Sequence, residues 1–244
     1  MSSEPLSSSS DDHLRTMSPE DCYEQVNQSS VEDHLESLGS NNLLRADARV
    51  RIYRTLFPFS PASIADVGCG VGLTTAALKR AYPGVTVFGY DVSENAIAYA
   101  TRTDLSGPEY RAVAAGPDVT LERSFDALIF QEFYPFTRTQ NFDIHSDFLR
   151  FIVNNLSKGG FAFIQLAVRH PERTILNNLP QLQTFCREHD LAFSQHMIPF
   201  DRLVDITGSV RLSALLTRTL ATVTGADRRI VLMLRRITEE TNGA

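Results

Sequence analysis

The sequence has no tryptophan, three cysteines and, among its 244 residues, only two lysines. The cysteines are scattered, at Cys22, Cys69 and Cys186, which argues against a metal cluster or a disulfide framework and favours a reducing, cytoplasmic compartment. Long apolar runs are missing too: FAFIQLAV is far shorter than a bilayer span, and the N-terminus does not resemble a signal peptide. We therefore expect a cytoplasmic protein that binds no metal and no membrane.

Positive charge is also scarce. The net charge is −6, and no basic stripe interrupts the acidic balance, so a nucleic-acid partner is not expected. Hydrophobic residues make up 43% of the chain and aromatic residues 9%, which is enough for a sizeable core. The length suits one α/β domain with attached pieces.

The first part of the chain divides into two segments. Residues 1–17 are rich in serine and poor in large apolar residues, which predicts a disordered tail. Residues 18–58 contain helix-start signals at Ser18 and Ser30 and helical apolar spacing from about Asn42 to Leu56. We expect this segment to form a helical lid or cap, or a homodimer contact.

Residues 59–240 form the predicted core, in which strand and helix patterns alternate. This alternation predicts an α/β fold with a mostly parallel sheet between two layers of helices. The expected strands are 63–67, 85–91, 110–115, 125–131, 161–168, 192–200 and 229–237. The expected helices are 73–82, 93–102, 145–157 and 175–189, with a helical insert at 207–227.

The segment IADVGCGVGLTT, residues 64–75, places three glycines where the first core strand meets the first helix. Gly68, Gly70 and Gly72 permit a tight turn, and they let a ligand approach the backbone because no Cβ intervenes. Ligands of such sheets bind at the carboxyl ends of the strands. Asp91 ends the next strand, 23 residues after Gly68, where its carboxylate can accept the two hydroxyls of a ribose.

Two cofactors fit this arrangement. A dinucleotide prefers the spacing G-x-G-x-x-G, but here Leu73 stands where its third glycine would be. Asp66 lies two residues before the first glycine, where its negative charge would repel a diphosphate. The same charge suits S-adenosylmethionine, which carries an ammonium and a sulfonium group.

These motifs resemble those of class I S-adenosylmethionine-dependent methyltransferases. Residues 66–72, DVGCGVG, resemble the first motif of that family, and FGYDVSENAIAYA resembles the second. SFDALIFQEFYPF resembles the fourth-strand motif, and LSKGGFAFIQL the turn into the fifth strand. The resemblance implies a Rossmann-like, seven-stranded sheet with the order 3-2-1-4-5-7-6 and an antiparallel seventh strand.

The resemblance also implies a function and a cofactor site. The function is methyl transfer (EC 2.1.1 type) from S-adenosyl-L-methionine to O, N or C of a small-molecule acceptor, in biosynthesis or specialised metabolism, leaving S-adenosyl-L-homocysteine. Asp91 would bind the ribose, and Val92 would lie beside the adenine. Many members carry an acid after the third strand; here either Asp118 or the backbone would contact the adenine amino group. The expected cofactor residues are Asp66, Gly68, Cys69, Gly70, Gly72, Asp91, Val92, Gln131 and Glu132.

The acceptor pocket is expected beside the fourth-strand loop QEFYPFTR. Phe133, Tyr134 and Phe136 would line a pocket for a flat or apolar acceptor; alternatively, these rings close the core. Arg45, with Arg49 one turn later, would reach an acidic acceptor or the cofactor carboxylate, or would face solvent. His145, His170 and Tyr134 are the catalytic candidates, and the alternative for both histidines is an exposed position.

Three other functions stay open at this stage. The protein could bind the cofactor and catalyse a cyclisation or an elimination, in which the cofactor is not consumed. It could be a non-catalytic binding protein on the same fold, although a scaffold does not need Asp66, the glycines and Asp91 together. A nicotinamide-dependent oxidoreductase is the most distant alternative.

Overall fold

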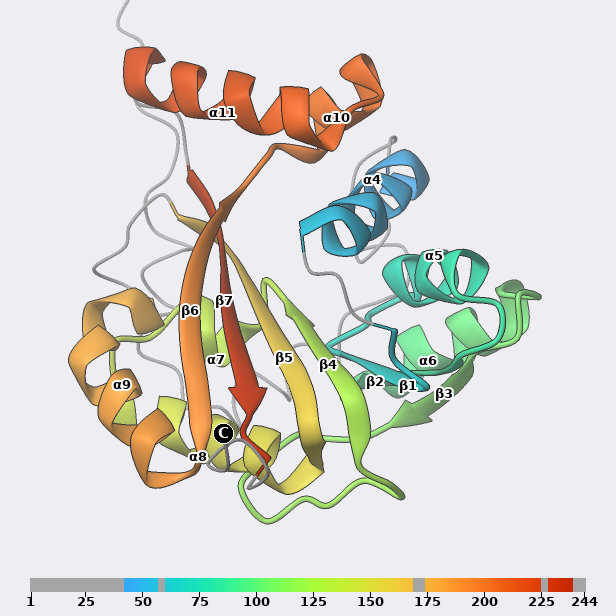
Figure 1. Cartoon of the computed structure of the whole chain (residues 1–244). Helices are drawn as coiled ribbons and strands as arrows, with labels where there is room; N and C mark the ends of the chain where they lie inside the picture. The colour runs from blue at the N-terminus through green and yellow to red at the C-terminus, as the bar shows by residue number, and fades with distance from the viewer. Residues whose placement is uncertain (1–41, 57–59, 169–173, 225–227, 239–244) are drawn as a thin grey trace, which may run out of the picture.

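The computed structural model describes residues 42–56, 60–168, 174–224 and 228–238. Within these ranges a seven-stranded sheet runs through the molecule with helices on both faces (Figure 1). The strand order is β3-β2-β1-β4-β5-β7-β6, and β7 is antiparallel to both of its neighbours. The predicted fold and strand order are therefore confirmed. The predicted tail and the helix starts at Ser18 and Ser30 lie outside the described residues.

The elements follow the predicted alternation closely. The strands are β1 Ser63–Val67, β2 Thr86–Asp91, β3 Glu109–Ala112, β4 Phe125–Gln131, β5 Leu156–Val168, β6 Leu191–Ile198 and β7 Arg228–Arg236. The α-helices are α4 Asn42–Leu56, α5 Leu73–Ala81, α6 Glu94–Thr103, α7 Tyr134–Thr137, α8 Phe142–Asn155, α9 Leu179–Glu188, α10 Asp201–Thr207 and α11 Val210–Thr224. A 3₁₀ turn, η2 Ile175–Asn178, precedes α9.

Capping residues at the helix starts explain why these helices could be predicted from the sequence. The side chain of Ser93 accepts a hydrogen bond from the Ala96 backbone N–H and caps α6, as predicted. Asn141 caps α8 in the same way through the Asp143 N–H. The sequence pattern missed α7, because this single turn carries Pro135 in its first turn and has no room for helical periodicity.

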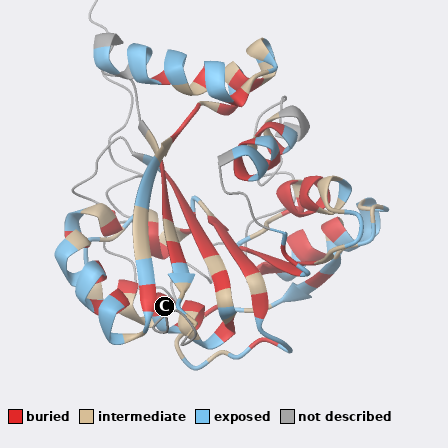
Figure 2. Ribbon diagram, viewed as in Figure 1, coloured by how far each residue is buried: buried red, intermediate tan, exposed pale blue. Residues whose placement is uncertain are grey.

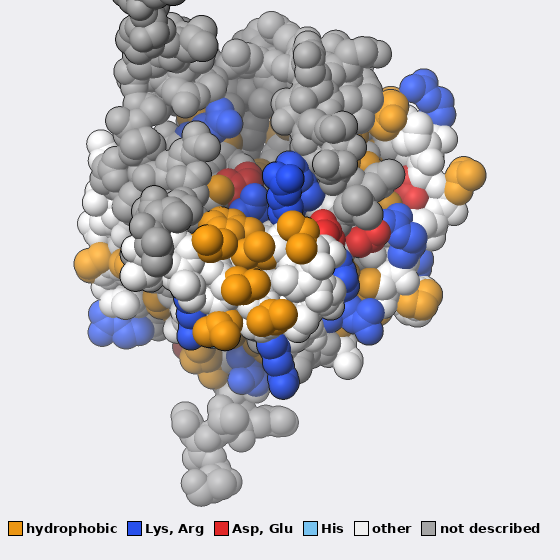
Figure 3. Space-filling model, turned by 90° about the horizontal axis from the view of Figure 1, so that it is seen from above, with side chains coloured by type: hydrophobic (Ala, Val, Ile, Leu, Met, Phe, Trp, Pro, Cys, Tyr) orange, Lys and Arg blue, Asp and Glu red, His pale blue; other side chains and the backbone are white. Residues whose placement is uncertain are grey.

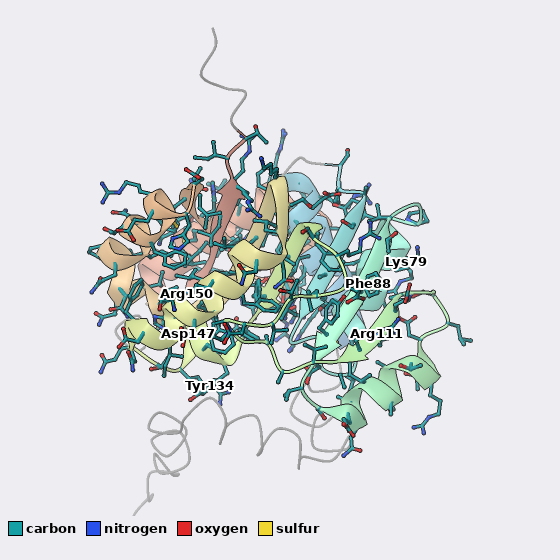
Figure 4. The ribbon with its side chains drawn as sticks, turned by 90° about the horizontal axis from the view of Figure 1, so that it is seen from below. Lys79, Phe88, Arg111, Tyr134, Asp147 and Arg150 are labelled. Atoms are coloured by element: carbon teal, nitrogen blue, oxygen red, sulfur yellow. The ribbon has the colours of Figure 1, made fainter. Side chains whose placement is uncertain are left out.

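The central strands are buried on both faces, which explains their continuous apolar sequences (Figure 2). On one face, Phe130 and Leu128 of β4 pack against α8 and α9. On the other face, Ala127 and Ile129 of the same strand pack against α4, α5 and the start of the α10–α11 insert. At the β3 edge, the Arg111 guanidinium lies over the ring of Phe88, 6.0 Å from its centroid (Figure 4). The helix-covered sheet thus leaves the strand ends as the place for a ligand.

Helices α4, α10 and α11 lie together at the top of Figure 1, where β6 leads into α10 and where α4 packs against α5, α10 and α11. We call these three helices the roof. Among the described helices, none is long and apolar enough to cross a bilayer.

Candidate functional site

The glycine segment forms a tight loop between β1 and α5. Gly68, Gly70 and Gly72 have φ angles of 78°, 53° and 80°, a conformation that strains any residue with a Cβ. A Cβ on Gly72 would lie 2.6 Å from the Tyr110 hydroxyl, whereas a Cβ on Gly70 would meet nothing within 4 Å. Gly72 is therefore required by packing, and Gly70 lies where the backbone is open to a ligand.

Most N–H groups of this loop already have acceptors inside the protein. Gly68 and Cys69 both donate to the Tyr90 carbonyl, at 2.7 and 3.0 Å, and Gly72 donates to the Cys69 carbonyl at 3.0 Å. Gly70 donates to the Asp91 carboxylate at 2.7 Å. A diphosphate would find these four donors in use and a carboxylate beside them, so the geometry disfavours a dinucleotide.

Asp91 is held firmly at the end of β2. One carboxylate oxygen accepts the Gly70 N–H and the other accepts the Ser93 N–H at 2.9 Å. The residue is only 9% exposed. Each oxygen keeps a second lone pair, so the carboxylate can accept two hydroxyl groups that lie side by side.

A cavity of about 220 Å³ lies beside Asp91 at the strand ends. Its apolar side is formed by Val67, Val92, Val113 and Ala115, and its other end by the segment that follows β4. Of the predicted site residues, the structure brings together in this lining Gly68, Asp91, Val92, Gln131, Glu132, Phe133 and Tyr134.

Four predicted cofactor residues do not line this cavity. Cys69, Gly70 and Gly72 shape the loop behind it. Asp66 is buried, and its carboxylate accepts a hydrogen bond from the Thr75 hydroxyl at 2.7 Å, towards α5. Burial raises the pKa of Asp66 to about 6, although the Thr75 hydrogen bond opposes this. The Asp66 carboxylate thus contacts Thr75, and its contact with a cofactor stays a prediction.

The segment after β4 begins with a strained residue. Glu132 has a φ of 50°, which is uncommon for a residue with a Cβ, and its N–H donates to the Gln165 carbonyl at 3.0 Å. Glu132 is an exposed residue by surface area, but the surrounding chain takes its carboxyl partly out of water. This desolvation raises the pKa of Glu132. The Ala167 N–H and the charges of Arg229 and Arg49 act in the opposite direction.

A polar chain connects the cavity to the roof. Gln131 accepts a hydrogen bond from the Thr74 hydroxyl at 3.1 Å, and Thr74 accepts one from Arg49 of α4 at 3.5 Å. Arg49 also binds the Asp201 carboxylate at 3.0 Å, and Arg229 of β7 binds the same oxygen at 2.6 Å. One carboxylate thus joins α4, α10 and β7.

Two buried polar atoms in this region have no hydrogen-bond partner among the described residues. One is the second carboxylate oxygen of Asp201, and the other is the amide nitrogen of Gln165. The Gln165 amide oxygen accepts the Tyr53 hydroxyl of α4 at 2.8 Å. Because such atoms cost free energy when unpaired, they mark a place that a polar ligand or a water fills.

The prediction for His145 needs correction. His145 is completely buried in α8, so it is neither exposed nor within reach of the cavity. Its Nε2 lies 3.1 Å from the Thr139 carbonyl and its Nδ1 lies 3.3 Å from the Asn178 amide. Burial lowers its pKa to about 4, so the ring stays neutral and structural. His170 lies outside the described residues.

Two of the three predicted aromatic residues line the cavity, and the third is buried in the core. Phe133 and Tyr134 line the cavity, and the Phe133 ring lies against Gly68, 2.8 Å from the position of a Cβ. Phe136 is fully buried in the core beside Phe130 and Phe148, so its predicted contact with an acceptor is wrong and the alternative of core closure holds. Arg45 lies on α4, and the cavity lining does not include it.

Several site residues had little signal in the sequence. Val113, Ala115 and Arg138 line the cavity, and Asp118, the candidate for the adenine contact, does not. Asp201 and Arg229 are 28 residues apart along the chain and meet only through the fold. Gln165 had a usable signal, since it is the single polar residue within the apolar run FAFIQLAV.

The residues present fit S-adenosylmethionine. The fixed Asp91 carboxylate suits a ribose, the valine and alanine side chains suit an adenine, and the polar end at Gln131 and Glu132 suits an amino-acid group. The N–H groups of Gly68, Cys69, Gly70 and Gly72 already have acceptors, which disfavours a diphosphate at this loop.

Comparison with known proteins agrees with this geometry. Residues 65–162 match a family model described as a methyltransferase domain. The trans-aconitate 2-methyltransferase of Deinococcus radiodurans is 31% identical over 124 residues, which is 50% of this chain. The chain spans 45% of the length of that relative.

Solved structures share the fold at low identity. The plantazolicin methyltransferase BamL, in complex with a desmethylPZN analogue and SAH (S-adenosylhomocysteine), has a TM-score of 0.60 at 14% identity, covering 93% of this chain and 99% of its own. The [4+2]-cyclase SpnF has a TM-score of 0.52 at 15% identity, covering 78% of this chain and 82% of its own. At these identities the likeness concerns the fold alone.

Proposed function

We propose that this chain, which carries a class I S-adenosylmethionine-dependent methyltransferase domain, transfers the methyl group of that cofactor to O, N or C of a small-molecule acceptor. The observation that carries the proposal is the Asp91 carboxylate, fixed by two backbone N–H groups at the wall of a cavity whose glycine loop has few donors left for phosphate.

The chain would hold the cofactor in three places. Asp91 would accept the ribose hydroxyls, and Val92, Val113 and Ala115 would enclose the adenine. Gln131 and Glu132 would meet the amino-acid end, where Glu132 offers a negative charge to an ammonium. Asp66 would act from behind, by tying β1 to α5 through Thr75.

The bound cofactor supplies an activated methyl group on a positively charged sulfur. The chain's own contribution is therefore alignment and exclusion of water, because the acceptor needs no strong activation if it is already deprotonated. This fits the cavity, whose lining among the described residues includes no histidine. Tyr134 at the cavity and His170 remain the proposed candidates for proton removal.

The acceptor would approach from the roof. Tyr53, Arg49, Gln165 and Arg229 face this side of the sheet, and Gln165 and Asp201 each have an unpaired buried atom for a polar acceptor. The match to an enzyme named for trans-aconitate supports a small carboxylic acid, from biosynthesis or specialised metabolism, as the acceptor class.

Calorimetric titration tests the cofactor first. S-adenosylhomocysteine should bind the purified chain at one site, and NAD⁺ at the same concentrations should give no heat of binding. Binding of NAD⁺ without binding of S-adenosylhomocysteine would overturn the proposal.

Incubation with methyl-labelled S-adenosylmethionine tests the reaction, with trans-aconitate as the first acceptor and a mixture of metabolite extracts as the second. The expected result is an acceptor that carries the label, with one S-adenosylhomocysteine formed per methyl transferred. With unlabelled cofactor, the mass of the acceptor should rise by about 14 daltons. Conversion of a substrate with the cofactor bound but unconsumed would instead support a cyclisation or an elimination on the same fold.

A further inference from the structure

Helix α11 buries polar side chains against the protein and exposes large apolar ones to water. The side that it buries against the protein carries Val210, Ser213 and Thr217 at helical spacing, two of them polar. The Ser213 hydroxyl lies 2.7 Å from that of Thr207, and the Thr217 hydroxyl accepts the Phe200 N–H at 3.2 Å. The buried side of this helix is thus held by two hydroxyl hydrogen bonds together with the apolar contact of Val210.

The opposite side of the insert carries large apolar side chains in contact with water. Ile206 of α10 is 72% exposed, and Leu212, Leu215 and Leu216 of α11 are 47%, 63% and 37% exposed. Figure 3 shows them gathered on one face of the molecule, which we call the leucine face. A contiguous apolar surface of this kind marks an interaction site.

Basic residues flank the leucine face. Arg202, Arg211 and Arg218 are exposed, and α11 contains no acidic residue at all. In a symmetric contact between two copies, the α11 arginines of one copy would face those of the other with no acid on either helix to neutralise them. The charge pattern therefore favours an acidic, apolar segment as the occupant.

This chain contains such a segment before α4. Residues 1–41 carry nine acidic residues and one arginine, a net charge of −8, whereas residues 42–244 carry 22 basic and 20 acidic residues. The helix predicted from Ser30 places Leu35 and Leu38 on one side, next to Glu32, Asp33 and Glu36. Its composition is complementary to the leucine face in both respects.

We infer that residues 30–38 dock on the leucine face of the same chain. Leu35 and Leu38 would lie against the exposed leucines, and the acidic residues of the segment would lie beside Arg211 and Arg218. Helix α4 begins at Asn42 and packs against both α10 and α11, so the preceding chain starts at the roof itself. Docking would fix α4, whose Tyr53 and Arg49 contact Gln165 and Thr74. The inference does not depend on methyl transfer.

The scarcity of lysine gives a clean test. Arg211→Lys and Arg218→Lys each add one amine to a chain that has only Lys79 and Lys158, and keep the positive charge. A zero-length carbodiimide cross-linker joins an amine to a carboxylate only when they are in contact. Mass spectrometry of the full chain should then show cross-links from positions 211 and 218 to Glu32, Asp33 or Glu36.

Two controls come from the opposite side of the molecule. Arg150 of α8 pairs with Asp147 at 2.9 Å, so Arg150→Lys should cross-link to Asp147 and show that the chemistry works (Figure 4). Arg187→Lys on α9 should give no cross-link to residues 30–38. Mixing ¹⁴N- and ¹⁵N-labelled protein separates links within a chain from links between two chains.

The outcomes decide the inference directly. Intrachain links from α11 to residues 30–38, together with increased hydrogen exchange of α11 in Glu32→Gln/Glu36→Gln, support it. Absence of these links in both lysine variants while the Arg150→Lys link forms overturns it. Links found only between differently labelled chains also overturn it and make a second copy the occupant.

Discussion

At the ends of β1 and β2, the polar groups that face the cavity are paired locally: the glycine loop, Asp91 and Ser93 satisfy one another within one stretch of chain. At the ends of β4, β5 and β7, the polar groups come from parts of the chain as far apart as Arg49 and Arg229. Among the described residues, two of their buried atoms have no hydrogen-bond partner: the Gln165 amide nitrogen and one Asp201 oxygen. The first half is complete before a ligand arrives, and the second is not. Under the proposed function, we place the cofactor's ribose and adenine at the first half and the acceptor at the second.

The largest expected effect is on the loop itself. Gly72→Ala should lower the free energy of unfolding by about 2–6 kcal/mol, because it combines a left-handed backbone with a Cβ placed 2.6 Å from the Tyr110 hydroxyl. Gly70→Ala, which has the same backbone cost but open space, should lose about 1–2 kcal/mol. Urea denaturation measures both, and equal losses would show that Tyr110 does not constrain the loop.

The next effect concerns Asp66, which makes the first half sensitive to pH. Its pKa rises from 3.8 to about 6 on folding, so the folded state holds more protons than the unfolded state between these values. Stability must therefore fall as the pH rises through this window, by about 3 kcal/mol in total. Asp66→Asn removes this dependence.

Denaturation of the cofactor-free protein at several pH values checks the Asp66 prediction. The unfolding free energy of the native chain minus that of Asp66→Asn should decrease between about pH 4 and pH 7. A difference that rises with pH would mean that the Asp66 carboxylate is stabilised in its ionised form, against the burial that the structure shows.

A smaller effect is expected for binding. Asp91→Ala should weaken the affinity for S-adenosylhomocysteine by about 1–3 kcal/mol, because the ribose hydroxyls lose their acceptor. Asp118→Ala is the matched control, since Asp118 does not line the cavity. Titration calorimetry measures both; an intact affinity in Asp91→Ala would remove the ribose from this place, and a loss in Asp118→Ala would restore that residue as the adenine contact.

The two halves also differ in what the sequence could predict. Most helix and strand bounds followed from hydrophobic periodicity and from capping residues such as Ser93, because these signals are local. The strand order followed from the resemblance to the methyltransferase family. The same holds for Asp91 and Val92, which occur at a fixed spacing after the glycines.

The second half could not be predicted in this way. Asp201 joins Arg49 and Arg229 only because α4, α10 and β7 meet in space, and no spacing along the chain records that contact. His145 was predicted as a site residue from its place near a helix start. It is buried because Asn178, 33 residues away, packs against it, and no local pattern records that contact. Phe136 likewise differs from Phe133 only through the direction in which the α7 turn points it.

The smallest expected effect on stability is the most informative about the acceptor. The double variant Tyr53→Phe/Gln165→Leu removes a buried hydrogen bond together with the unpaired amide nitrogen, so the free energy of unfolding should change by less than about 1 kcal/mol. The single variant Gln165→Leu, which takes away the Gln165 acceptor while the Tyr53 hydroxyl stays buried, should lose about 1–3 kcal/mol. If the pair serves the acceptor, the double variant should keep its affinity for S-adenosylhomocysteine while KM for the acceptor rises. A double variant that is destabilised as much as the single one would instead make Gln165 a structural residue, and the acceptor would then have to be sought on the other side of the cavity, at Tyr134 and Arg138.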